Sequence, residues 1–245
     1  MILALPTELR LRIAEYALEQ RPAAGIPYMG SRLQEHENEY RPSQNLALLL
    51  VCRQFNTDFA QLAYNKTRFV LWDHERGTHL QQLPPHILRD IRKLAFLLGA
   101  HEIQSWDKYF YDVELLRLDE LVFLCPARWT NGPLNIRNVV RFLRRLAHVK
   151  TVKFVVYGKG EGLSRAPCFS LIGMIMKEDH FQRYDAPGAP NIEATGWDWH
   201  ISTPENSVTL KAREPRPVLA EEDYMLLMKP EVDAFMAAAQ REAGL

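Results

Sequence analysis

The sequence predicts an α/β protein in which an N-terminal helical module is packed on a region of mostly parallel strand–helix units. Two amphipathic helical patterns, over residues 5–20 and 48–62, open the chain. Three short segments of the form apolar-x-x-apolar-x-Phe then recur, at 91–98, 118–125 and 149–156. Strands joined through helices are usually parallel, so we expect Phe96, Phe123 and Phe154 to lie in register.

The composition is that of an ordinary globular chain, and it argues against several classes of protein. Of the 245 residues 47% are hydrophobic, and 30 Lys and Arg balance 30 Asp and Glu, so the net charge does not favour nucleic acid or a charged membrane surface. The cysteines Cys52, Cys125 and Cys168 are too far apart for a zinc site or a disulfide framework. Without a membrane-length apolar stretch or a secretion signal, we expect an intracellular protein, cytoplasmic or nuclear, with no membrane partner.

The first predicted helix, over residues 5–20, has two apolar sides. Pro6 in its first turn and Glu8 near its positive end favour a helix. The two apolar sets, on nearly opposite sides, are Leu9, Ile13 and Tyr16, and Leu11, Ala14 and Leu18. A surface helix needs only one apolar side, so either both sides are internal or one of them faces a partner.

The next segment predicts a loop and then a helix. Residues 20–45 contain three prolines, two glycines and many polar residues, which is typical of a long loop. The helix that follows carries one apolar stripe, expected to be core, made of Leu48, Val51, Cys52, Phe55, Phe59 and Leu62. A short apolar strand is predicted over 67–72. The helical module therefore covers residues 1–66, and the strand–helix domain covers 67–245.

The later part of the chain predicts helices and one hairpin. Residues 136–147 have the spacing of an amphipathic helix, and 169–181 that of a helix interrupted by Gly173. A loop is expected over 183–196. Residues 197–202 and 208–213 resemble an antiparallel hairpin. Two closing helices are predicted over 219–228 and 230–244, the second beginning at Pro230.

Two groups of residues in the strand–helix domain are candidates for binding a target. Trp197 and Trp199 stand together in the hairpin; exposed tryptophans mark recognition surfaces, whereas buried ones anchor a hairpin. A basic side of the 136–147 helix carries Arg137, Arg141, Arg144 and Arg145. It matches an acidic partner or phosphates, but also the solvated face of an ordinary amphipathic helix, which the neutral net charge favours.

No motif predicts catalysis, a cofactor or a metal. The eight histidines lack the HExxH spacing, and no Gly-x-Ser-x-Gly motif is present. The segment 157–164 has three glycines, but Leu163 occupies a position where a dinucleotide fingerprint needs glycine. We therefore predict no catalytic residue, no cofactor-binding residue and no metal ligand. A less favoured alternative is an enzyme with a pocket at the strand ends, near Gly99, Cys125 and Gly158.

The two N-terminal patterns together resemble those of the F-box-like proteins abundant in filamentous fungi. Such proteins begin with a Leu-Pro-x-Glu-Leu helix, continue with a Val-Cys-Arg helix and end near a Leu-Tyr pair and an aromatic strand. The matching residues are Leu5, Pro6, Glu8 and Leu9, then Val51, Cys52 and Arg53, then Leu62, Tyr64 and Phe69. The resemblance covers about the first 72 residues, and the segment 91–98 is similar to the leucine-rich continuation of these proteins.

The resemblance implies a non-enzymatic adaptor of a cullin–RING ubiquitin ligase. The F-box helices would bind a Skp-type subunit, and the leucine-rich-like region would hold an unknown protein target. By position, the contacts with the Skp-type subunit would be Leu5, Pro6, Leu9, Ile13 and Val51. The polar loop departs from a compact F-box. The alternative is therefore a stand-alone interaction protein that keeps the fold without the ligase, with both apolar sides of the first helix in its core.

Overall fold

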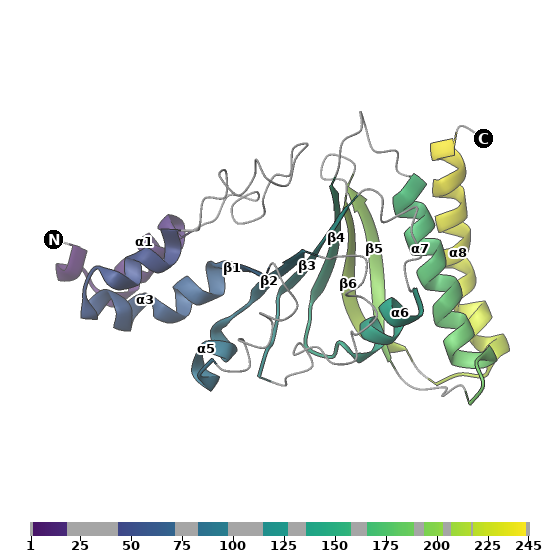
Figure 1. The fold of residues 1–245 in the computed structure, drawn as a ribbon, viewed down its shortest axis with the longest axis horizontal. Coiled ribbons are helices and arrows are strands. Elements are labelled where there is room, and N and C mark those ends of the chain that lie inside the picture. Colours follow the sequence, from purple (N-terminus) through teal and green to yellow (C-terminus); the bar gives the residue numbers. More distant parts are fainter. Residues whose placement is uncertain are drawn as a thin grey trace.

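A computed structural model of the 245-residue chain describes residues 2–18, 44–71, 83–97, 115–126, 136–157, 166–188, 194–202, 207–216 and 218–243. The helices are η1 (Ile2–Ala4), α1 (Thr7–Ala17), η2 (Gln44–Leu50), α3 (Arg53–Lys66), α5 (Pro85–Asp90), α6 (Ile136–Arg145), α7 (Ala166–His180), the π-helical turn η6 (Phe181–Asp185) and α8 (Glu221–Ala243). The strands are β1 (Arg68–Leu71), β2 (Lys93–Leu97), β3 (Glu120–Pro126), β4 (Thr151–Tyr157), β5 (Ala194–Ser202) and β6 (Ser207–Arg216). In Figure 1, α1 and α3 lie at one end of the molecule and α7 and α8 at the other, with the sheet between them.

The strands form one six-stranded sheet in the order β1-β2-β3-β4-β6-β5. Strands β1 to β4 are parallel, β6 runs antiparallel to β4, and β5 runs antiparallel to β6. The predicted α/β class with a mostly parallel sheet is confirmed. The predicted hairpin is also present, with Ser202 opposite Ser207 at its closed end.

The three recurring phenylalanines lie next to one another across the sheet. Phe96 pairs in register with Phe123, and Phe123 with Phe154. The ring centroids of these pairs are 5.9 and 5.4 Å apart. Because side chains alternate along a strand, the intervening Ala95 and Val122 point to the opposite face, where they form a smaller cluster. The phenylalanine face carries the main core.

Helices α6, α7 and α8 cover the phenylalanine face of the sheet. The inward side of α6 contributes the buried residues Val139, Val140, Phe142 and Leu143 to the main core. From α7 come Leu171 and Ile172, and from α8 comes Phe235. The prediction of an amphipathic helix in this region is confirmed by α6, since its apolar period matches the buried side.

Helix α1 packs on α3 in a separate hydrophobic cluster. Ala14 and Leu18 from α1 join the buried Phe55, Phe59 and Ala63 of α3. This cluster is distinct from the main core of the sheet.

The predicted continuous helix across residues 48–62 is wrong at its start. A 3₁₀ turn, η2, ends at Leu50, and α3 begins only at Arg53. Cys52 caps α3 with an extended backbone (φ −161°, ψ 166°), so Val51 lies at the break and is exposed. Apolar residues keep a helical spacing on both sides of such a break. The spacing alone therefore does not show where the α-helix begins.

Two other predicted boundaries are corrected. Helix α7 continues through Gly173, and the ring of Phe235 packs beside it, 3.5 Å from where a β-carbon would be. The two closing helices are one helix, α8, with Pro230 inside it. Tyr224 and Phe235 are both buried on the inward side, one before and one after the proline, and their packing outweighs the lost backbone hydrogen bond. The predicted loop 183–196 begins inside η6 and ends in β5.

Several predictions concern parts of the chain outside the described residues. Most of the expected loop 20–45 and nearly all of the glycine-containing segment 157–164 are among them. Gly99 and Gly158, named for a pocket at the strand ends, also lie outside the described ranges. Within those ranges, no helix combines the length and the apolar character needed to cross a membrane.

Candidate functional site

The outer side of α1 is apolar and faces away from the other described parts of the chain. Leu9 and Ile13 are 51% and 44% exposed, and Tyr16 is 76% exposed. The opposite side turns Ala14 and Leu18 toward α3, where both are buried. Of the set Leu11, Ala14 and Leu18, only Ala14 and Leu18 join the cluster with α3, and Leu11 is 37% exposed.

The orientation of α1 is held by a buried arginine. Arg10 makes an ion pair of 3.0 Å with Asp58 of α3. Its guanidinium also donates to Thr7 Oγ1 at 3.0 Å and to the Leu3 carbonyl at 3.3 Å. Because Arg10 stands on the same side as Ala14, these contacts fix that side toward α3 and leave Leu9 and Ile13 outward.

All five residues that the resemblance assigns to a Skp-type partner are exposed. Leu5 is 36% exposed at the start of α1, and Pro6 beside it is also exposed. Val51 is exposed at the break between η2 and α3. Leu5, Leu9 and Ile13 therefore supply a row of apolar side chains along α1, which we call the α1 face.

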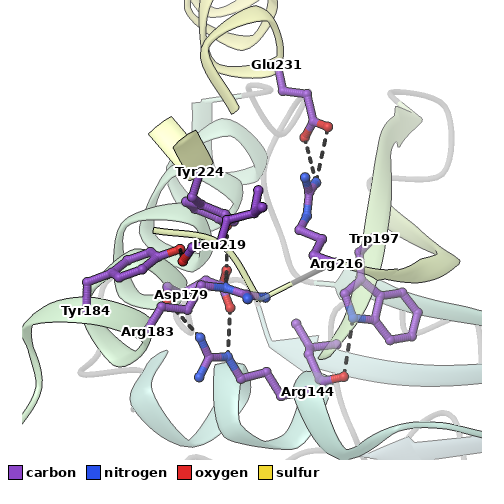
Figure 2. A network of polar contacts seen from close by, with 10 residues as sticks. Arg144, Asp179, Arg183, Tyr184, Trp197, Arg216, Leu219, Tyr224 and Glu231 are labelled. Atoms are coloured by element: carbon purple, nitrogen blue, oxygen red, sulfur yellow. Dashed lines mark hydrogen bonds and ion pairs between the residues drawn. The ribbon is translucent and has the colours of Figure 1, made fainter. Parts of the chain in front are cut away.

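A second candidate site is a polar network between the sheet-covering helices, centred on Asp179 of α7 (Figure 2). Arg144 of α6 donates through Nε to Asp179 Oδ1 at 2.8 Å and through Nη2 to the Asp179 carbonyl at 2.9 Å. Arg183 donates through Nε to Oδ2 at 2.9 Å, and the Tyr224 hydroxyl donates to the same oxygen at 3.0 Å. One carboxylate thus joins α6, α7, η6 and α8.

The charges of this network are fixed by burial and by neighbouring groups. Burial alone would raise the pKa of Asp179, but the Arg183 and Arg144 guanidinium groups outweigh it and lower that pKa below its ordinary value. Burial, and then the charge of Asp179, raise the pKa of Tyr224 to about 12. At neutral pH Asp179 is therefore ionised and Tyr224 is neutral, which suits holding elements together rather than transferring protons.

A small cavity of about 80 Å³ adjoins the network. Trp197, Leu210 and Arg216 from the hairpin line it together with Arg144 and Glu231. Arg216 donates to both carboxylate oxygens of Glu231 at 3.1 and 3.0 Å (Figure 2). The cavity is large enough to hold water molecules.

The residues predicted to bind a target separate into two groups. Trp197 donates through Nε1 to the Leu143 carbonyl at 3.3 Å, and Trp199 packs edge-on against Phe235 at 5.5 Å, so both anchor the hairpin against the helices. Arg144 is committed to Asp179, with an 8% exposed side chain.

Arg137 and Arg141, in contrast, are exposed on the outer side of α6. The structure therefore brings Trp197 and Arg144 to one cavity but leaves Arg137 and Arg141 outside it.

Sequence reasoning missed the whole polar network. Asp179 and Arg183 stand four positions apart, a spacing typical of an exposed helical ion pair. Nothing in the sequence distinguishes that ordinary pair from one whose arginine is almost fully buried. Tyr224 likewise stands in an acidic first helical turn without a sign of its partners.

We predict that the contribution of Tyr224 to stability is lost in alkaline solution. Its folded-state pKa of about 12 exceeds the ordinary value of 10.0, so the unfolded chain releases the phenolic proton first. The stabilisation is therefore fully present below pH 10 and is lost as the pH rises toward 12. Urea unfolding of wild type and Tyr224→Phe at a series of pH values should show the advantage of wild type shrinking across this interval. A constant difference would contradict the assignment.

Within the described residues, no cluster of histidine, cysteine, aspartate or glutamate has the arrangement of a metal site. Cys168 is buried, and burial raises the pKa of its thiol. Comparisons with protein-family models, with curated proteins and with solved structures find no match to this chain.

Proposed function

We propose that the protein is a non-enzymatic interaction adaptor of the F-box-like type, which binds a Skp-type subunit through the α1 face and carries a target on its strand–helix domain. The observation that carries the proposal is that Leu9 and Ile13 on α1, and Leu5 just before it, are exposed although each is apolar. These are residues that the resemblance assigns to the partner.

The exposed row favours a partner over a purely internal role. A stand-alone protein whose two apolar helix sides are both core would bury Leu9 and Ile13, whereas here only the side with Ala14 is buried. Apolar side chains in an i, i+4 arrangement on an outward helix side match recognition by a hydrophobic groove. In the proposed ligase complex, the Skp-type subunit covers these side chains.

The target would be held by the sheet domain, where the three strands with register-paired phenylalanines correspond to the leucine-rich-like region of the resemblance. Arg137 and Arg141 of α6 are the members of the predicted target-binding set that are free to face solvent. A basic pair on the outer side of a helix suits an acidic segment of a target.

The test is complex formation between the purified full chain and a purified Skp-type subunit. Wild type should co-elute with the subunit in size-exclusion chromatography. Leu9→Asp combined with Ile13→Asp should weaken the complex by at least about a hundredfold, because each substitution places a charge in an apolar interface. The same variant should keep the wild-type circular dichroism and melting temperature, since both positions are outward.

A matched control carries two aspartates elsewhere. Val218→Asp combined with Leu227→Asp changes the net charge equally, at exposed positions just before and within α8, which lies at the other end of the molecule (Figure 1). This control should bind the Skp-type subunit as wild type does. A folded wild-type protein that ignores the subunit would overturn the proposal, and unfolding of the Leu9/Ile13 variant would show that these side chains are core.

A further inference from the structure

Helix α8 exposes an apolar surface that the fold itself does not use. Leu226 is 71% exposed, and Met225 and Met236 are 50% and 49% exposed. These side chains border a groove of about 890 Å³ between α7 and α8, to which α7 contributes Met176. Contiguous exposed apolar surface of this kind on a folded protein marks an interaction site.

Eight of the exposed residues form one stripe along the helix. At 3.6 residues per turn, the members of the stripe fall within about a third of the helix circumference. They are Glu222, Met225, Leu226, Lys229, Asp233, Met236, Ala237 and Gln240, and all are exposed. We call this set the α8 stripe. Tyr224 and Phe235 stand on the inward side of the helix and are buried.

When two α8 helices are placed antiparallel with Glu231 at the centre, the side chains of the two α8 stripes complement one another. Leu226 and Met236 lie equally far before and after that residue, and so do Lys229 and Asp233. An antiparallel copy of α8, related by a two-fold axis at this point, therefore sets leucine against methionine and lysine against aspartate. Both pairings occur twice, because a two-fold interface repeats each contact.

The outer positions of the stripe agree with the same register. Met225 meets Ala237 of the second copy, and Glu222 meets its Gln240, so no like charges face each other along the stripe. Within one chain, Lys229 and Asp233 already form an exposed ion pair of 2.9 Å. In the paired arrangement each of these charges gains a second opposite charge from the other copy.

We infer that the protein forms a two-fold symmetric homodimer in which two α8 helices pack antiparallel through the α8 stripe. The charge pattern favours a second copy of this chain over an unrelated helix as the partner. In one register, the charges of the α8 stripe are complementary to those of an antiparallel copy. The dimer leaves the α1 face open, since α1 and α8 lie at opposite ends of the molecule (Figure 1). It therefore presents two α1 faces per particle.

The primary test is the mass of the full-length chain in solution, measured by light scattering during size-exclusion chromatography. Wild type is expected to be a dimer. Lys229→Asp makes positions 229 and 233 both acidic, and Asp233→Lys makes both of them basic. In each variant, both contacts across the two-fold axis therefore bring like charges together. Each is expected to weaken dimerisation by at least about tenfold.

Mixing the two variants provides the decisive control. Acids of one chain then meet bases of the other at both positions, so the mixture should form a heterodimer although neither variant forms a homodimer. Lys229→Asp combined with Asp233→Lys in one chain should also restore the homodimer. Leu226→Glu tests the apolar part of the stripe independently of the central charges and should give a monomer. Circular dichroism checks that every variant is folded.

Each result decides the inference. A wild type that stays monomeric overturns it, and so does a dimer that the single-charge variants leave intact, because the contact would then lie elsewhere. Heterodimer formation by the mixed variants supports this register specifically. Binding of the Skp-type subunit is a separate measurement on the α1 face, so either proposal can fail without the other.

Discussion

Asp179→Asn is expected to lower the stability of the protein by about 3 kcal/mol, or the melting temperature by roughly 6–12 °C. The substitution keeps the size of the side chain but removes the charge that two arginines share. The Arg183 and Arg144 side chains are only 1% and 8% exposed, so neither guanidinium gains a compensating hydration shell. Breaking a buried ion pair on one side is costly because the other charge remains buried.

A double substitution separates this explanation from a general loss of packing. Asp179→Asn leaves the charges of Arg144 and Arg183 buried without their carboxylate, and Arg183→Met removes one of these two charges. Asp179→Asn combined with Arg183→Met should therefore cost less than the sum of the two single changes. The free energies of unfolding, measured in urea, give this coupling directly. Asp185→Asn serves as the control, since the Asp185 side chain is 53% exposed and its change should stay within about 0.5 kcal/mol. Additive single and double effects would argue against a shared buried charge.

Phe123→Ala is expected to cost about 3–5 kcal/mol, because it opens a cavity at the centre of the main core. Phe123 is 1% exposed and touches three other rings, those of Phe96, Phe154 and Phe142. The substitution removes one ring from the row that crosses β2, β3 and β4, so the aromatic contacts on both sides are lost together.

Two further variants keep the Phe123 prediction testable if the alanine variant does not fold. Phe123→Leu retains most of the volume and should cost less than about 1.5 kcal/mol. Phe181→Ala changes the same residue type at a 39% exposed position in η6 and should cost less than about 1 kcal/mol. Chemical denaturation of all three variants gives the ranking. Equal effects of Phe123→Ala and Phe181→Ala would contradict the central role of the ring row.

Periodicity predicted two apolar sides on the first helix, and the resemblance assigned Leu5, Leu9 and Ile13 to a partner, whereas nothing in the sequence predicted the Asp179 network. Helical spacing already divides Leu9 and Ile13 from Ala14, because residues three and four apart share a side of any helix. Which of the two sides is buried depends on Arg10, and its partner Asp58 stands on another helix. The spacing of Asp179 and Arg183 is equally regular, but their burial depends on α6 and α8 meeting over them.

The amino-acid sequence by itself determined the elements whose pattern repeats locally: the register of Phe96, Phe123 and Phe154, the inward side of α6 and the pairing of the hairpin. Only the tertiary structure decided that α8 continues through Pro230, that α3 starts after Cys52, and which charges are buried. The physical reason is that side-chain periodicity follows from backbone geometry within one element. The environment of a proline, a cap or a charge, in contrast, is set by distant segments that pack against it.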